Sequence, residues 1–376
     1  MVIGYAFPVR RWRDLPLDRI DARIGRYSFD AASPIAEHTW DAAYRSAQTA
    51  LSALAGLESG EHTHAFALCR PPGHHAGRDY LGGYCDLATA GRTLVGETRL
   101  PGFDPARYAV ERIQAAAPDG TMVPVTLLPR RDAPRDGSAP LLLYGYGAYR
   151  VSSDPVFSLP ATVLVDARWR YAIAHVRGVG ELGQRWFKDG KRFHKRNSMS
   201  DFIACASHVA DAGYAAFHRI VAYGLSAGGL LVGGAMTIAA ERWAGVIAKV
   251  PFVDMLNTMS DADQPLVPLF RPGWGDPLAD PQAFAYIHSI SPYENLRPAD
   301  YPPLLCTAGL QDDRVSYGEP AKLVAQVRYR TTGCSPAILL VDPDAGHQAS
   351  ADLYSEYIEM ARFWAFAETF VTSAAS

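Results

Sequence analysis

The sequence contains little cysteine and no pair of cysteines at close spacing. Its 376 residues include five cysteines, an odd number without a CxxC motif: Cys69, Cys85, Cys205, Cys306 and Cys334. Such scattered thiols do not outline a disulfide framework, and most of them are expected to fill the core. Reduced thiols are typical of the cytoplasm, so we predict a cytoplasmic location for this protein.

Long apolar runs and an excess of charge are also absent from the sequence. No uninterrupted apolar stretch reaches the roughly 18 residues that a membrane-spanning helix needs. Arg10 and Arg11 follow too soon after Met1 for a signal peptide. The formal net charge is -3, which gives no electrostatic reason to bind nucleic acid or an anionic membrane. We therefore expect a soluble globular protein with neither nucleic acid nor membrane as a partner.

Short apolar runs alternate with longer stretches of helical periodicity along most of the chain. Two runs flank the turn Pro118-Asp119-Gly120 and predict a β-hairpin. Further strands are predicted at 65–69, 141–144, 171–176, 220–223, 304–307 and 338–341. Helices are predicted at 39–51, 199–212, 230–242 and 351–370, with Asn197 and Ser198 as capping candidates for the second. This alternation predicts an α/β fold, in which helices cover both faces of a mainly parallel sheet.

A serine lies at the junction of a predicted strand and a predicted helix. The strand at 220–223 leads into Gly224-Leu225-Ser226-Ala227-Gly228, and helical periodicity follows from Leu230. Small residues on both sides of Ser226 permit the sharp turn that presents a nucleophile, and the helix start behind it brings backbone N–H groups near a developing oxyanion. The GxSxG pattern alone is weak, but between this strand and this helix it predicts a nucleophilic serine.

A serine nucleophile needs a histidine base and a carboxylate that orients the histidine. Downstream of Ser226, Asp312 follows one predicted strand and His347 follows the next. The order Ser, Asp, His is that of α/β-hydrolases, so we predict that these three residues form a catalytic triad. Asp313 and His288 are the alternatives, and we expect surface or structural roles for both.

Several further segments of the chain resemble one known family. They are Tyr144 to Tyr149, Gly180 to Trp186, Asp189 to Lys191, Arg196 to Phe202, Val250 to Asp254, Ser291 to Asn295 and Glu319 to Lys322. In this order they resemble the peptidase domain of the prolyl oligopeptidase family from about Gly102 onward, most closely its oligopeptidase B branch. The resemblance implies an α/β-hydrolase fold and the hydrolysis of peptide bonds through an acyl-enzyme.

The resemblance also implies roles for residues around the nucleophile. The hydroxyl of Tyr146 joins the amide of Ala227 as an oxyanion donor, and Tyr149 contributes to substrate binding. Glu181 matches an acidic residue that holds a basic side chain of the substrate. An acidic segment of the family is replaced here by residues 268–273, so we expect cleavage after a single Arg or Lys rather than after paired basic residues.

The N-terminal part of the chain resembles a different family. Histone-deacetylase-like amidohydrolases, in particular acetylpolyamine deacetylases, begin with segments similar to Tyr27 to Asp30, Thr39-Trp40, Arg70 to Gly77 and Gly82 to Cys85. In that family an adjacent histidine pair, here His74 and His75, is the general acid/base site. The DxH segment and the later Asp that hold its zinc do not follow in this sequence. We therefore expect a vestigial deacetylase site without a metal.

The two resemblances predict three parts in the chain. They are a truncated deacetylase-like segment at 1–90, a junction at 91–101, and an α/β-hydrolase peptidase domain at 102–376 without the β-propeller of its family. The favoured function is that of a serine endopeptidase or oligopeptidase that acts on a peptide substrate without a cofactor. Zinc-dependent deacetylation and an inactive truncated fusion are the alternatives, and the sequence leaves the oligomeric state open.

Overall fold

The computed structural model describes residues 39–65, 67, 102–264, 266–347 and 353–373. The chain divides into two compact units, residues 1–101 and residues 102–376. In the first unit the described residues form helix α2 (Thr39–Glu58), which confirms the helix predicted at 39–51. The strand predicted at 65–69 lies mostly outside the described residues. The division into a deacetylase-like segment, a junction and a peptidase domain stays a prediction.

The second unit is built on one eight-stranded sheet with the strand order β1-β2-β4-β3-β5-β6-β7-β8. Strands β3 to β8 pair in parallel, whereas β1 and β2 form an antiparallel hairpin whose second strand pairs antiparallel with β4. The strands are β1 (Glu111–Ala116), β2 (Met122–Leu128), β3 (Leu141–Tyr144), β4 (Arg170–Ala174), β5 (Ile220–Leu225), β6 (Gly245–Lys249), β7 (Leu304–Gly309) and β8 (Ala337–Asp342). The prediction of a mainly parallel sheet is confirmed.

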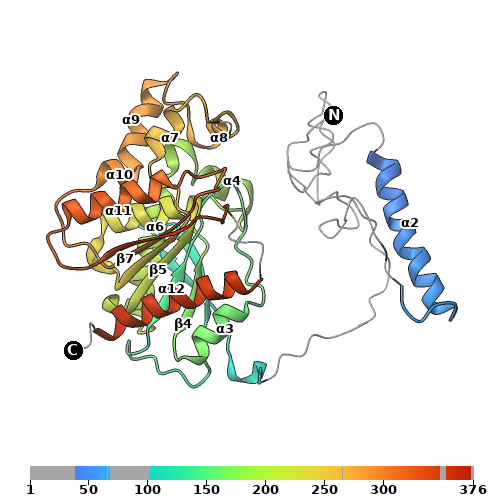
Figure 1. Cartoon of the computed structure of the whole chain (residues 1–376). Coiled ribbons are helices and arrows are strands. Elements are labelled where there is room, and N and C mark those ends of the chain that lie inside the picture. Colours follow the sequence, from blue (N-terminus) through green and yellow to red (C-terminus); the bar gives the residue numbers. More distant parts are fainter. Residues whose placement is uncertain (1–38, 66, 68–101, 265, 348–352, 374–376) are drawn as a thin grey trace. The chain divides into compact units, whose positions relative to one another are not determined.

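Helices cover both faces of this sheet (Figure 1). Helices α3 and α12 pack on one face, and α5, α6 and α11 pack on the other. The helices of the second unit are α3 (Leu159–Asp166), α4 (Gly183–Lys188), α5 (Arg196–Asp211), α6 (Ala227–Ile238), α7 (Met255–Ser260), α8 (Val267–Trp274), α9 (Pro281–Ile290), α10 (Pro292–Asn295), α11 (Gly318–Arg330) and α12 (Leu353–Ser373), with short 3-10 turns at Pro105–Arg107, Arg192–His194, Phe217–Arg219 and Ala240–Arg242.

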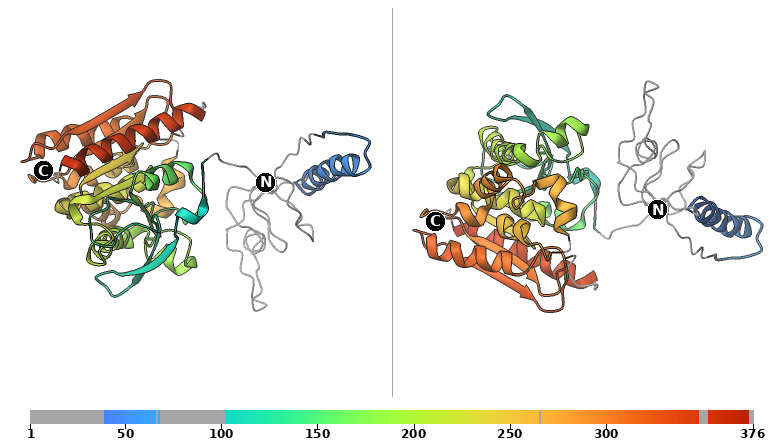
Figure 2. Two further views of the ribbon diagram at one scale, coloured as in Figure 1. Left: turned by 90° about the horizontal axis from the view of Figure 1, so that it is seen from below. Right: turned by 90° about the horizontal axis from the view of Figure 1, so that it is seen from above.

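The sheet separates two hydrophobic cores because successive side chains of a strand point to opposite faces. In β3, Leu141 and Leu143 belong to the core under α5 and α6, whereas Leu142 belongs to the core under α3 and α12. Figure 2 shows the sheet between these layers, from the cyan hairpin at one edge to the orange β8 at the other. Because strands β3 to β8 run parallel, their carboxyl ends lie at the same end of the sheet, where loops from different strands meet.

The structure corrects two details of the sequence-based prediction. Helix α5 begins at Arg196, so Asn197 and Ser198 lie inside its first turn and do not cap it. Their side chains donate instead to the carbonyl oxygens of Asp189 and Arg177. Strand β6 was absent from the predicted strands, although it lies between β5 and β7. Within the described part of the chain, no helix is long and apolar enough to cross a bilayer.

Candidate active site

Ser226 lies between β5 and α6 in a backbone conformation that few side chains adopt. Its φ is 53° and its ψ is -119°, in the left-handed half of conformational space. The turn closes tightly, because a Cβ atom added at Gly224 would collide with the Gly228 carbonyl. At Gly228 an added Cβ would lie 2.7 Å from the carbonyl oxygen of Gly145. Only glycine fits at these two positions, so the GLSAG sequence is what allows β5 to turn directly into α6.

The structure brings Ser226, His347 and Asp312 together at the carboxyl ends of β5, β8 and β7. The Nε2 atom of His347 lies 2.9 Å from Ser226 Oγ, and its Nδ1 atom lies 2.8 Å from Asp312 Oδ2. With the proton on Nδ1, the histidine donates to Asp312 and presents Nε2 as the acceptor for the serine proton. Ser226 is partly exposed, whereas the side chains of His347 and Asp312 are 6% and 1% exposed. This arrangement can activate a serine hydroxyl that a substrate can reach.

Asp312 is held as an ionised acceptor. Burial alone would raise the pKa of its carboxyl group, but hydrogen bonds from His347 and from the amides of Val315 and Arg314 outweigh this and hold the pKa below its usual value. The alternatives lie elsewhere: Asp313 is exposed on the same loop, and His288 is exposed on α9.

Two donors that the sequence assigned to the oxyanion hole lie beside Ser226. Ala227 is the first residue of α6, where the N–H groups have no partner within the helix. The hydroxyl of Tyr146, two residues after β3, is near enough to the Ser226 side chain for the serine to lower its pKa slightly. Burial raises the pKa of Tyr146, and the nearby charge of Arg314 partly offsets this. Sequence reasoning missed Arg314, although it lies two residues after Asp312.

Tyr149 belongs to an aromatic cluster next to Tyr146. The centroids of these two rings lie 6.5 Å apart, and Tyr149 also packs against Phe270 at 5.8 Å and Trp274 at 5.6 Å. The indole of Trp274 donates to the Tyr149 hydroxyl at 2.9 Å. Tyr149 itself is 40% exposed, so the cluster offers an apolar surface near the nucleophile. The sequence did not predict the part played by α8 in this cluster.

The side chain of Glu181 is largely buried, and its two carboxylate oxygens differ in their hydrogen bonding. Its Oε1 accepts hydrogen bonds from the amide of Ser153 at 2.8 Å and from His175 Nδ1 at 2.9 Å. The second nitrogen of His175 contacts the Thr126 hydroxyl at 2.8 Å. The other oxygen, Oε2, is buried and has no hydrogen-bond partner. A buried carboxylate oxygen without a hydrogen-bond donor is costly in a protein interior.

The residues assigned to a vestigial deacetylase site, His74 and His75, lie outside the described residues. Within residues 39–65, 67 and the described part of 102–373, no group of three or more His, Cys, Asp or Glu side chains is placed to hold a metal ion.

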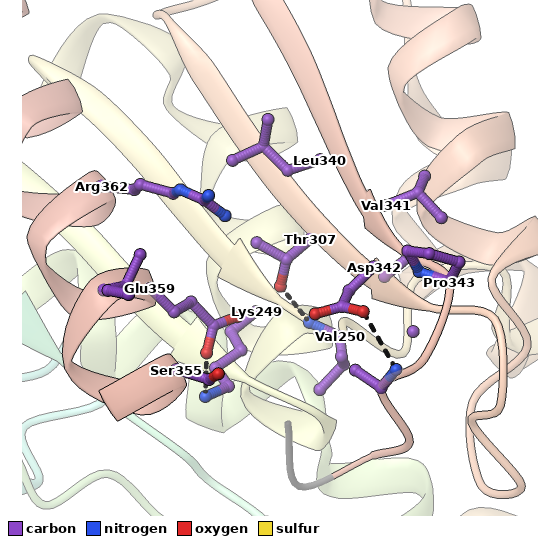
Figure 3. A pocket seen from close by; sticks show the side chains of 14 residues that line it. Lys249, Val250, Thr307, Leu340, Val341, Asp342, Pro343, Ser355, Glu359 and Arg362 are labelled. Carbon is purple, nitrogen blue, oxygen red and sulfur yellow. Dashed lines mark hydrogen bonds and ion pairs between the residues drawn. The ribbon is translucent and has the colours of Figure 1, made fainter. Parts of the chain in front are cut away.

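A cavity of about 370 Å³ lies behind the loop that carries His347, between the ends of β6 to β8 and α12 (Figure 3). The ion pair of Lys249 and Glu359 crosses one side of it, and the Thr307 hydroxyl accepts from the amide of Val250. Asp342 accepts from the amide of Ala345 and so holds the start of the His347 loop. No member of the triad lines this cavity.

The chain is similar to several known proteins. A sequence profile of the "Prolyl oligopeptidase family" matches residues 155–373. The chain is 36% identical over 369 residues to "Dipeptidyl aminopeptidase BI" of Pseudoxanthomonas mexicana, covering 94% of this chain and 51% of that protein. It is 39% identical over 264 residues to "Protease 2" of Moraxella lacunata, covering 70% of this chain and 38% of that protein. The chain thus spans about half or less of the length of these relatives.

A solved structure and a second profile add to the comparison. Oligopeptidase B from Leishmania major superposes with a TM-score of 0.71 at 38% identity, over 73% of this chain and 38% of that one. A profile of the "Histone deacetylase domain" matches residues 11–91, as the N-terminal resemblance predicted. The alignment with the Pseudoxanthomonas protein covers 94% of this chain, so it also extends into that segment.

The prolyl oligopeptidase profile covers more than half of the chain, and the solved relative has the α/β-hydrolase fold found here. The fold and the resemblance predicted from the sequence are thereby confirmed. The chain belongs to the prolyl oligopeptidase family.

Proposed function

We propose that the protein is a serine peptidase in which Ser226 is the nucleophile, His347 the general base and Asp312 the orienting carboxylate. The observation that supports this most strongly is the continuous line of contacts from Ser226 Oγ through His347 to Asp312, at 2.9 and 2.8 Å. Membership of a family of peptidases and the names of the relatives support the same reaction class.

The proposed reaction proceeds through an acyl-enzyme. Ser226 Oγ attacks the carbonyl carbon of the scissile bond while its proton passes to His347 Nε2. The oxyanion that forms accepts hydrogen bonds from the Tyr146 hydroxyl and the Ala227 amide, donors worth roughly 3 kcal/mol each in such sites. His347 then gives its proton to the leaving amine, and water releases the acyl group by the same steps in reverse roles.

A fluorophosphonate probe tests this assignment directly. The probe forms a bond only with an activated serine, so we expect the wild-type protein to be labelled and the Ser226→Ala variant to remain unlabelled. A third sample, His347→Ala, is expected to react far more slowly, because the base is gone while the serine remains. Labelling of soluble Ser226→Ala protein at the wild-type rate, or a folded wild-type protein that resists the probe, would contradict the proposal.

We also propose that Glu181 gives the enzyme a preference for Arg or Lys on the N-terminal side of the cleaved bond. The support is the unpartnered Oε2, since a guanidinium or ammonium group would supply the donor that this oxygen lacks. Oε1 is already engaged by Ser153 and His175, which holds the carboxylate in one orientation.

We expect Glu181→Gln to lower kcat/KM for an Arg substrate by roughly 10- to 100-fold, the effect of losing one charge-assisted hydrogen bond. Hydrolysis of a matched substrate with Leu in place of Arg is expected to change less than about threefold. Asp189→Asn is a suitable control, because Asp189 is another acidic residue of the same region and pairs with the exposed Arg185. Equal losses with the Arg and Leu substrates would show that Glu181 has only a structural role.

Further assays distinguish the alternative functions. Substrates with free and blocked amino termini distinguish an oligopeptidase from an enzyme that removes dipeptides. Deacetylation of acetyl-lysine that a zinc chelator abolishes would favour the deacetylase alternative, and a folded protein without any hydrolytic activity would favour an inactive fusion. A peptide substrate and a cytoplasmic location remain predictions, the latter supported by the free thiols of Cys205 and Cys306 in the core.

A further inference from the structure

Lys195 is a charged residue in the interior of the second unit. Its relative exposure is 1%, and within the described residues no carboxylate forms an ion pair with it. Its Nζ atom instead donates hydrogen bonds to the carbonyl oxygens of Gly147 and Gly190 and to Ser198 Oγ, the last two at 3.2 and 3.1 Å. The ring of Trp274 lies 5.2 Å from Nζ and adds a cation–π contact. We call these four groups the Lys195 cage.

The Lys195 cage fits an ammonium group better than a neutral amine. Ser198 donates its own proton to the carbonyl oxygen of Arg177 at 2.5 Å, so toward Lys195 its oxygen can only accept. All three hydrogen-bond partners are therefore acceptors. An ammonium group has three N–H donors and satisfies all of them, whereas an amine has two and leaves one acceptor without its donor.

The Lys195 cage holds the turn that carries the oxyanion tyrosine. Gly147 follows Tyr146, and its φ of +77° belongs to a conformation that favours glycine. The Gly147 carbonyl lies so close to Gly178 that a Cβ atom added at Gly178 would collide with the carbonyl oxygen. Lys195 binds the same carbonyl. The backbone next to Tyr146 is therefore fixed between Gly178 and Lys195.

Burial and one neighbouring charge determine the pH at which Lys195 is an ammonium group. Burial lowers its pKa to about 7, and the charge of Asp201 opposes this only in part. Below this pKa the cage holds an ammonium group, which is lost as the pH rises through about 7. Of the ionisable groups around the cage, Asp201 pairs with Arg177, Asp189 with Arg185 and Arg271 with Asp276. Tyr149 bonds to Trp274, Lys191 lies over Phe187, and Arg192, His194 and Arg196 flank Lys195 in the chain.

We propose that Lys195 is a positioning residue for the oxyanion hole: by fixing the Gly147 carbonyl, its ammonium group holds the Tyr146 hydroxyl where the oxyanion forms. This inference rests on the proposed function, because it assigns a role within that reaction. Lys195 touches neither the substrate nor the reacting atoms. It acts through Tyr146, so its contribution is measurable only while the tyrosine hydroxyl is present.

A double-mutant cycle between Lys195 and Tyr146 tests this coupling. Tyr146→Phe is expected to lower kcat by roughly 10²- to 10³-fold, as for the loss of one oxyanion donor. We expect Lys195→Met in the wild-type background to lower kcat by roughly 10- to 100-fold with KM nearly unchanged, because a misplaced donor costs transition-state binding. In the Tyr146→Phe background the same substitution is expected to cost less than about threefold. Lys191→Met, a neighbouring lysine outside the cage, is the matched control.

The pH dependence gives a second test that needs no substitution at Lys195. The ratio of kcat for the wild type to kcat for Tyr146→Phe cancels every pH effect that the two proteins share. We expect this ratio to fall as the pH rises through about 7, because the Lys195 ammonium group is lost there. This test stands even where Lys195→Met fails to fold, which thermal unfolding reports.

Three outcomes overturn the inference. Equal losses of kcat on changing Lys195 in the two backgrounds would assign it a structural role, and a kcat ratio that is constant across pH would exclude its ammonium group. Both of these results leave the proposed function intact. If Ser226→Ala leaves hydrolysis unchanged, the proposed function is wrong and the role of Lys195 is lost with it.

Discussion

Replacement of Asp312 by Asn is expected to lower kcat by about 10⁴-fold without unfolding the protein. Asp312 accepts the Nδ1 proton of His347 and so leaves Nε2 free to take the serine proton. An Asn side chain can present its NH₂ group to Nδ1, which forces the ring proton onto Nε2 and abolishes the base. Steady-state hydrolysis of an activated ester and thermal unfolding of the same sample measure the two effects.

The neighbouring carboxylate provides the matched control. Asp313 is exposed on the same loop, so Asp313→Asn is expected to retain wild-type kcat and stability. If the two variants lose activity to the same extent, the loop requires acidic residues in general and the orienting role of Asp312 is wrong. A fall in the unfolding temperature of Asp312→Asn that accounts for the whole loss of activity would lead to the same conclusion.

Substitution of Gly190 by Ala is expected to destabilise the second unit by more than about 3 kcal/mol. A Cβ atom at Gly190 would collide with the backbone of Arg177 and with the amide nitrogen of Gly178, neither of which can rotate away. The Gly190 carbonyl also accepts from Lys195, so a displaced backbone disturbs the Lys195 cage as well. The thermal unfolding temperature is expected to fall by roughly 10 °C.

The Gly183→Ala variant is a control that distinguishes this steric collision from the cost of placing a side chain at a positive φ. Its φ is +86°, but an added Cβ atom would meet no heavy atom within 4 Å. Gly183→Ala is therefore expected to cost only about 1 kcal/mol, the price of a left-handed conformation for a residue with a side chain. Similar unfolding temperatures for the two variants would contradict the proposed collision at Gly190.

Most of the fold could be predicted from the sequence because its strands are short, apolar and clearly bounded. The hairpin is an example: Gly120 adopts a φ of +80°, and Asp119 accepts from the amide of Thr121, as the turn sequence suggests. Strand β6 escaped prediction because Gly245 begins it and Lys249 ends it, which breaks the apolar pattern. Its pairing with β5 and β7 is a tertiary effect that no local pattern reports.

The helix start at Arg196 shows a second limit of local patterns. Asn197 and Ser198 have typical capping side chains, but each donates to a carbonyl outside α5, those of Asp189 and Arg177. Capping propensity describes what a side chain can do within its own turn. Here the close packing of Gly190 against Arg177 offers these side chains other partners, and the tertiary contacts prevail.

The triad and the oxyanion tyrosine could be proposed from residue type, chain order and family resemblance, because each lies just after a strand. The supporting residues could not. Lys195 belongs to a basic stretch that includes Lys191, Arg192 and Arg196, and in a sequence such a stretch indicates a solvated surface. Only the structure shows that one of these cations is buried while its neighbours are not. The contact of His175 with Glu181 could not be predicted either, because it depends on how the chain turns back after β4.

The groups proposed for the reaction, from Tyr146 to His347, all belong to the second unit and are held by the exits of strands within one sheet. These groups are therefore all encoded by one continuous block of sequence. Recombination ahead of Gly102 can exchange what accompanies the hydrolase unit while leaving its bond-breaking atoms in register.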